Sequence, residues 1–253
     1  MSNVKRQRDA LYGTDYVMPL WMPFAPMAVV LVSTLLIATL AVAYPADRIP
    51  DAVAVVVFAL LAIALAAVIV SLYVFYKLIV RRNQHFKRVR LLYTNVADLL
   101  EGLGSARAVS VRSIVREMEV EEQERSAVLW IVLTLLVGIV AFYVYHFLNK
   151  DFHRHSIREK RLLEEVARGL EEVGVAPAFT PEELRVVPSR STLVYILLSL
   201  ITAGVFGLYW LYTLTKDPNE HFRSHRRIEK SLVSALERAV EEKLPPMETA
   251  GAG

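Results

Sequence analysis

The sequence predicts an all-α integral membrane protein with four transmembrane helices, amphipathic juxtamembrane helices and an internal repeat of helix-plus-tail units. Three observations lead to this fold class. Hydrophobic residues make up 55% of the chain and the mean hydropathy is +0.38, both above the usual range of soluble domains. Charged residues, at 22%, fall between the apolar blocks. The segments that follow three of these blocks also resemble one another.

The composition excludes several classes of protein and of site. The 253 residues include no cysteine, which excludes a disulfide framework, a thiolate nucleophile and any cysteine-ligated metal. The chain has no G-x-S-x-G, P-loop or G-x-G-x-x-G motif, so neither an enzymatic activity nor a cofactor is expected. The preference for arginine over lysine and the scarcity of Asn and Gln fit a thermophilic source.

Four apolar stretches reach the length of about 20 residues that a helix needs to cross the hydrocarbon core of a bilayer. They run from about Pro26 to Tyr44, Ala52 to Val80, Ser126 to Leu148 and Thr192 to Leu214. Lys77 is the one Lys, Arg, Asp or Glu inside them. It lies near the end of the second stretch, where its side chain reaches the interface.

These stretches divide the chain into parts with an expected orientation. The parts are a cytoplasmic N-terminal segment (1–25), a hairpin of spans 1 and 2 (26–80), a cytoplasmic helical segment (81–125), span 3 (126–148), a helical connection (149–191), span 4 (192–214), and a C-terminal amphipathic helix and tail (215–253). Alternating crossings with the N-terminus inside place 20 of the 29 Lys and Arg residues on the cytoplasmic side and 9 outside, so the positive-inside rule predicts a multi-pass protein of the cell membrane with its N-terminus in the cytoplasm.

The chain repeats itself after three of the spans. Residues 72–101 match residues 208–237 at ten of 30 positions. At a second offset, of 70 residues, residues 149–172 also match residues 219–242. Each copy has an aromatic exit from the span, an Asn and a Phe three residues apart, basic residues, and then an amphipathic helix with an apolar stripe. The signature residues are Asn83, His85, Phe86, Asn149, Phe152, His155, Asn219, His221 and Phe222.

The repeat leaves a second topology open. Equivalent tails favour equivalent surroundings, yet four full crossings put the middle tail on the opposite face of the membrane. In the alternative, the third and fourth segments are re-entrant hairpins that break near Gly138 and Gly204, so that all three tails stay cytoplasmic. Four spans are the favoured interpretation. Gly138, Thr202 and Gly204 are the residues expected at a helix break or in a pore.

The fourth segment carries a motif of small and aromatic residues. From Ser199 to Tyr212 the chain reads S-L-I-T-A-G-V-F-G-L-Y-W-L-Y. With its flanking residues, over 190–222, this segment resembles a prokaryotic family of small integral membrane proteins of unknown function. The resemblance implies a membrane location and no activity.

Six histidines lie within about a dozen residues of a predicted membrane exit. Asp217, His221 and His225 are spaced four apart, so that one helical face presents three candidate metal ligands. No Glu accompanies the pair as an H-E-x-x-H motif requires, and Asp217 precedes Pro218 where a helix cap is equally suitable. Hydrogen bonding of these histidines to headgroups or carboxylates is therefore the favoured interpretation, and a metal site is the alternative.

Basic residues gather on the predicted cytoplasmic side. They are expected to contact anionic lipid headgroups or partner proteins, or to serve only as a stop signal for the spans. Nucleic acid is the less favoured partner. The residues are Arg81, Arg82, Lys87, Arg88, Arg223, Arg226 and Arg227.

These features favour a non-enzymatic role. We expect a membrane scaffold or assembly subunit that forms homo-oligomers or joins a membrane complex and presents its helical tails to partners. The alternative is an oligomeric passive channel or small-solute permease. No Lys, Arg, Asp or Glu lies in the middle of a span, which argues against a transporter driven by protons or sodium.

Overall fold

The structure is a computed structural model, and it describes residues 1–45 and 48–243. These residues form helices and no β-strand, so the all-helical class is confirmed. The helices are α1 (Ser2–Thr14), α2 (Ala25–Ala43), α3 (Asp51–Gly102), α4 (Arg107–Glu121), α5 (Ala127–Leu136), α6 (Val140–Glu172), the short 3₁₀ helix η2 (Pro181–Glu183), α7 (Thr192–Ile201) and α8 (Val205–Lys243). The end of the C-terminal tail, over 244–253, lies outside the described residues.

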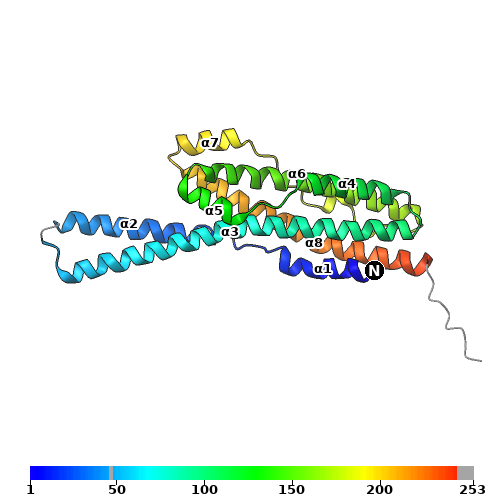
Figure 1. Cartoon of the computed structure of the whole chain (residues 1–253), viewed down its shortest axis with the longest axis horizontal. Coiled ribbons are helices and arrows are strands. Elements are labelled where there is room, and N and C mark those ends of the chain that lie inside the picture. Colours follow the sequence, from blue (N-terminus) through cyan, green and yellow to red (C-terminus); the bar gives the residue numbers. More distant parts are fainter. Residues whose placement is uncertain (46–47, 244–253) are drawn as a thin grey trace, which may run out of the picture.

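Helix α2 and the first half of α3 form an apolar hairpin that projects from the rest of the molecule (Figure 1). Both are long and apolar enough to cross a membrane. Only 11% of the most apolar window of α2 and 6% of that of α3 is buried. A core helix of a soluble protein would bury most of this surface, because exposed apolar area is costly in water.

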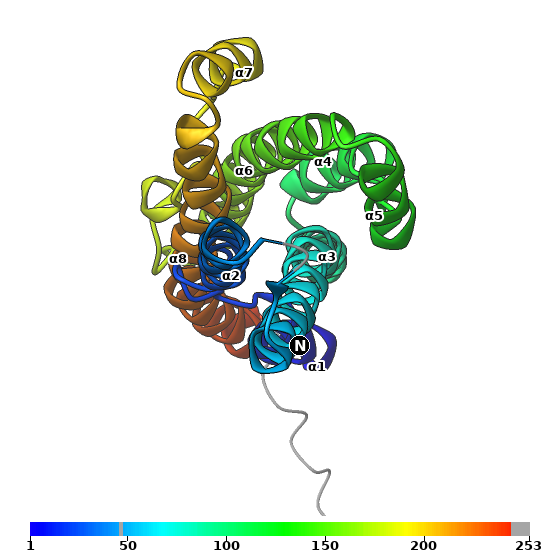
Figure 2. The same ribbon diagram turned by 90° about the vertical axis from the view of Figure 1, so that its left-hand side faces the viewer.

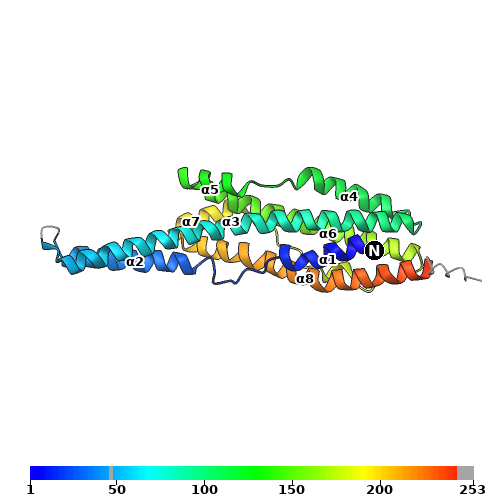
Figure 3. The ribbon, with the colours of Figure 1, turned by 60° about the horizontal axis from the view of Figure 1, so that its bottom comes forward.

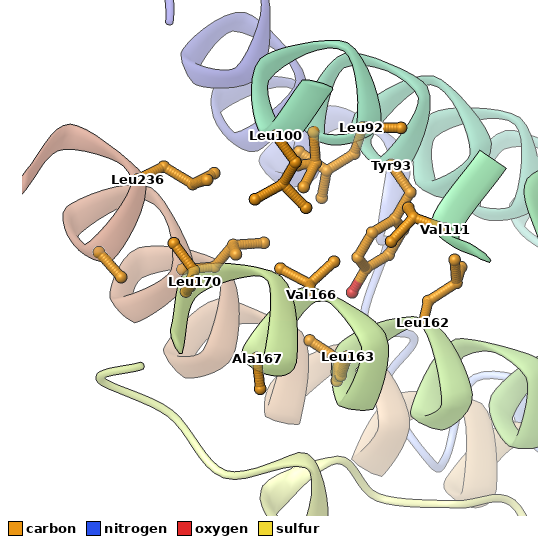
Figure 4. Packing of buried hydrophobic residues seen from close by; sticks show 14 of the residues in the cluster. Leu92, Tyr93, Leu100, Val111, Leu162, Leu163, Val166, Ala167, Leu170 and Leu236 are labelled. Carbon is orange, nitrogen blue, oxygen red and sulfur yellow. The ribbon is translucent and has the colours of Figure 1, made fainter. Parts of the chain in front are cut away.

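The second half of α3 continues directly into a helical bundle with α1, α4, α6 and α8. Apolar residues recur along one face of each helix and meet in a single core, drawn in Figure 4. Leu92, Tyr93 and Leu100 from α3 face Leu162, Val166 and Leu170 from α6 across this core, and Leu236 joins them from α8 (Figure 4). The tails after the second, third and fourth apolar segments therefore pack on one another.

Helix α1 lies along α3 and α8 (Figure 3). The apolar side chain of Val4 in α1 lies in the bundle core. The segment between α1 and α2 then leads to the apolar hairpin. This segment is held to α8 by Asn219, whose side-chain amide donates to the carbonyl of Met18 at 2.7 Å and accepts from its N–H at 3.0 Å. The N-terminal residues thus form part of the bundle.

The prediction of four transmembrane helices is not confirmed. Helices α5 and α7 have ten residues each, or about 15 Å at 1.5 Å per residue, which is half of the about 30 Å hydrocarbon core. Each turns back within three residues and packs against the start of the next long helix: the ring centroids of Trp130 and Tyr143 are 5.1 Å apart, and those of Tyr195 and Trp210 are 5.3 Å apart. The breaks fall at Gly138 and Gly204.

The two short hairpins and the α2–α3 hairpin extend from the same end of the bundle (Figure 1). Figure 2, viewed from that end, places α5 and α7 on different sides of the α2–α3 pair. All three helical tails consequently start at one level and run in parallel away from it. This arrangement is the one that the re-entrant alternative predicts.

Candidate metal centre

Four histidines from three helices converge in the bundle, just beyond the point where the apolar hairpins begin. His85 lies on α3, His155 on α6, and His221 and His225 on α8. No more than 1% of any of these side chains is exposed. Glu159, one turn after His155, is equally buried and points into the same space.

The ring Nε2 atoms of these histidines face one another. The Nε2 of His221 lies 3.3 Å from that of His85 and 3.2 Å from that of His225. The Oε2 atom of Glu159 lies 2.9 Å from the Nε2 of His225 and 3.3 Å from that of His221. His155 completes the group: its Nε2 lies 3.7 Å from Glu159 Oε2, and one ligand atom from each of His85, His155, Glu159 and His221 lies within 4.8 Å of the others.

The opposite ring nitrogen, Nδ1, of each histidine faces an acceptor. In His85 it lies 2.9 Å from Asp15 Oδ1, and in His155 it lies 2.9 Å from Glu122 Oε2. In His225 it lies 2.8 Å from Glu229 Oε1, and in His221 it lies 2.8 Å from a main-chain carbonyl, that of Arg185. A carboxylate or carbonyl oxygen accepts only, so the network assigns a proton to each Nδ1.

This assignment gathers acceptors at the centre. A neutral imidazole that is protonated on Nδ1 presents a lone pair at Nε2, so the neutral rings point lone pairs at one another around the Glu159 carboxylate, which the Tyr93 hydroxyl also approaches. The Nε2 of His155 has no hydrogen-bond partner in the described part of the chain. Buried acceptors without donors are costly, and a cation bound among them removes that cost.

The spacing of the donor atoms fits a metal ion. Ligand atoms in a tetrahedron with bonds of about 2.0–2.1 Å are about 3.3 Å apart, close to the 3.2 and 3.3 Å between the Nε2 atoms of His85, His221 and His225. The carboxylates behind the Nδ1 atoms supply the carboxylate–histidine pairing that orients metal-binding imidazoles and raises their basicity. His85, His155, His221 and Glu159 are the candidate ligands, and His225 is a fifth donor.

The centre is enclosed by apolar rings. The phenylalanines Phe86, Phe152 and Phe222 pack together on one side, with centroids 5.3 and 5.8 Å apart. The ring of Phe86 stacks on His155 at 4.0 Å. The main bundle core begins on the other side with Tyr93. The surroundings therefore exclude water, which strengthens the electrostatic interactions inside.

Buried charges form a second layer around the histidines. Arg88 donates from Nη2 to Asp15 Oδ2 at 2.9 Å and from Nη1 to Glu229 Oε2 at 2.8 Å. Both carboxylates also accept from a histidine of the centre. Glu122, behind His155, lies 3.4 Å from a nitrogen of Arg158. Arginines thus hold the carboxylates that orient the rings.

The protonation of the centre reflects burial and these neighbours. Burial lowers the pKa of His85, and the adjacent histidines and Arg88 lower it further. Burial also lowers the pKa of His225, but the carboxylates of Glu159 and Glu229 outweigh this effect and raise the pKa of His225 to about 10. Without a metal ion, one proton on His225 thus neutralises Glu159 and leaves the other lone pairs unsatisfied.

Asp15→Asn is expected to weaken metal binding about 10- to 100-fold, because the amide no longer accepts a charge-assisted hydrogen bond from the Nδ1 of His85. Competition with a chromogenic chelator measures the change in affinity. Asp9→Asn is the matched control, since Asp9 lies on the surface of the same N-terminal segment and pairs with the neighbouring Arg8. An Asp15→Asn affinity equal to that of Asp9→Asn would contradict the role of Asp15.

The structure brings two of the three metal ligands predicted from the sequence to the centre and places the third elsewhere. It places His221 and His225 at the centre and Asp217 outside it. The Asp217 carboxylate accepts from Arg190 at 2.6 and 2.9 Å. Asp217 is also interior to α8, since Pro218 lies within that helix, and therefore does not cap its start.

Three of the basic residues proposed for headgroup contact are buried in the bundle. Arg81, Arg82 and Arg88 are exposed by 1–2%. Arg82 pairs with Asp151 at 2.8 Å, and Arg81 donates to Asn219 at 3.2 Å. The remaining basic residues lie nearer the surface, where Lys87 is 3.7 Å from Glu124 and Arg226 lies over the ring of Tyr12. Arg223 and Arg227 line a surface pocket.

The spacing in the sequence indicates two of the four histidines of the centre, His221 and His225, as ligands, and it does not indicate Glu159. His85 and His155 stand in the sequence as members of the repeat signature. The same offset of 70 residues that pairs His155 with His225 also pairs Glu159 with Glu229. Matched polar residues on otherwise apolar helical faces are the signal that indicates a shared buried site.

Comparison with known proteins extends to one segment of the chain. Residues 190–236 match a family described as a domain of unknown function, DUF4234. This segment contains α7, most of α8, and the two histidines of α8. No curated protein matches the chain, and no solved structure matches it either.

Proposed function

We propose that this protein is a membrane-anchored metalloprotein whose ion fastens the helical tails of α3, α6 and α8 together. The observation that carries this proposal is the convergence of four histidine rings and the Glu159 carboxylate in one buried space, with their ligand-type atoms facing one another. Imidazole nitrogens with a carboxylate and no sulfur suit a divalent transition-metal ion, with Zn²⁺ and Fe²⁺ as the leading candidates.

The ion has a structural role in this proposal. Five donor atoms leave little room in the coordination shell for a substrate, and the phenylalanines and the bundle core close the space around them. A non-enzymatic scaffold, with or without partner subunits, therefore remains the favoured class. An oligomeric passive channel is the second class.

The membrane anchor in this proposal is the α2–α3 hairpin. Its two helices expose apolar side chains over nearly their whole surface, as lipid-facing helices do. The bundle lies in the cytoplasm, because the basic residues concentrate in its helices and in the segment before α2. The N-terminus is cytoplasmic as a consequence.

Metal analysis of the purified protein tests the proposal. We expect about one transition-metal ion per chain in protein extracted and purified in detergent without chelators. His155→Ala and His221→Ala are expected to lose the ion, because each removes a ligand. His153→Ala is the matched control, since its ring nitrogen bonds the carbonyl of Val187 outside the centre.

Elemental analysis with plasma mass spectrometry gives both the stoichiometry and the identity of the ion. A native protein that holds no transition metal, even after incubation with Zn²⁺ or Fe²⁺, would overturn the proposal. Equal metal content in His155→Ala, His221→Ala and His153→Ala would place the ion elsewhere in the chain.

A further inference from the structure

The two short hairpins, α5–α6 and α7–α8, are apolar on all sides at their tips. Leu136 and Ile139 of the first are exposed by 76% and 72%, and Ile201 and Val205 of the second by 79% and 67%. Most of the surface of each of these four side chains is therefore left uncovered by the rest of the described chain. Surface of this kind requires an apolar solvent.

The turn between α7 and α8 provides its own hydrogen bonds. Each main-chain N–H over 202–207 has an acceptor within the hairpin. The Thr202 hydroxyl accepts from the N–H of Phe206 at 2.9 Å and donates to the carbonyl of Leu198 at 2.7 Å. Gly204, with φ of 92°, takes the left-handed conformation that closes α7, and its N–H bonds the carbonyl of Ser199 at 2.7 Å.

This hydrogen bonding distinguishes the turn from an ordinary surface loop. A loop in water leaves such N–H groups to the solvent, whereas in hydrocarbon an unpaired N–H group is costly and must be paired internally. Thr202, Ala203 and Gly204 belong to the T-x-G part of the motif in the fourth segment. The motif therefore encodes a turn suited to a dry environment.

Both hairpins are closed at their base by the same device. An Arg-Ser pair precedes each short helix, as Arg125-Ser126 and Arg190-Ser191. Each serine caps its helix by accepting from an N–H three residues on. The two arginines bind aspartates on the following long helix, Asp151 at 3.4 Å and Asp217 at 2.6 Å. These charged groups mark where each hairpin meets water.

We infer that α5–α6 and α7–α8 are re-entrant hairpins that enter only the bilayer leaflet next to the bundle. From the charged base to the tip, α5 and α7 measure about 15 Å, the thickness of one leaflet's hydrocarbon. This inference rests on the membrane placement proposed above. In that leaflet six helices occupy the membrane, and in the other only α2 and α3 do, so the protein is wider on the side of the bundle.

Depth measurements with nitroxide labels test the inference. The chain has no cysteine, so single cysteines carry one label each at exposed positions: Ile139 and Ile201 at the two tips, Leu35 in the middle of α2, and Val42 near its far end. The full-length protein is reconstituted in phosphatidylcholine–phosphatidylglycerol vesicles. Collision with oxygen and with a water-soluble nickel chelate then gives the depth of each label.

We expect the labels at Ile139 and Ile201 to lie at the depth of Leu35, near the bilayer centre, and the label at Val42 near the opposite interface. Labels at Ile139 and Ile201 that reach the depth of Val42 or that contact water would overturn the inference. The proposal that α2 and α3 anchor the protein in the membrane would be unaffected. A label at Leu35 that is itself in water would overturn both the inference and the membrane anchor.

Discussion

Removal of the metal ion with a chelator is expected to lower the melting temperature of the protein by about 8–16 °C. An ion held at about 1,000 times its dissociation constant stabilises the native state by about 4 kcal/mol. A domain of 150–250 residues shifts by about 2–4 °C for each kcal/mol. Circular dichroism at 222 nm measures the transition in detergent, after elemental analysis has shown that the ion is gone.

The variants of the centre separate the effect of the ion from the effect of the fold. His155→Ala is expected to melt at a reduced temperature with or without the chelator, because its ion is already absent. His153→Ala keeps the ion and is expected to retain the full chelator-dependent shift. Restoration of the native melting temperature by one metal and not by others then identifies the ion. An unchanged melting temperature in metal-free native protein would show that the ion does not hold the tails together.

The helices of this protein are largely predictable from local pattern, and the depth of its hairpins is not. The apolar stripe of α6, with Leu162, Val166 and Leu170, is readable as a packing face because it recurs at helical spacing. A stretch of 23 apolar residues, however, has the same hydropathy whether it crosses the bilayer or folds back. In the structure the fourth stretch folds back at a turn that the hydrogen bonds of Thr202 and Gly204 close. Average hydropathy does not depend on such hydrogen bonds.

The metal centre was predictable only in its local part. His221 and His225 are four residues apart on one helix, so their shared face follows from helical geometry. His85 is 136 residues away from His221, and its approach depends on how α3 rotates against α8. The repeat contained this information, because similar helical tails that pack on one another direct equivalent side chains inward. Asp217 was misleading, since its partner Arg190 lies in the connection before α7.

Replacement of Arg88 by methionine is expected to destabilise the protein by about 3–5 kcal/mol, because it leaves the buried carboxylates of Asp15 and Glu229 without their cation. Burial works against the charge of Arg88, yet Glu229 and Asp15 outweigh it and raise the pKa of Arg88 above its ordinary value. The cation is therefore always present in the native state. Chemical unfolding in detergent, followed by circular dichroism, measures the change in free energy.

Lys87→Met is the matched control, since the neighbouring Lys87 side chain is 63% exposed and its carboxylate partner is 3.7 Å away. Its loss is expected to leave the unfolding transition unchanged. The double variant Arg88→Met/Glu229→Gln removes one of the two uncompensated charges, so part of the lost stability returns if the buried charge is the cause. If the double variant is no more stable than Arg88→Met, the loss comes from packing of the long Arg88 side chain, and the charged layer around the histidines contributes orientation without net stability.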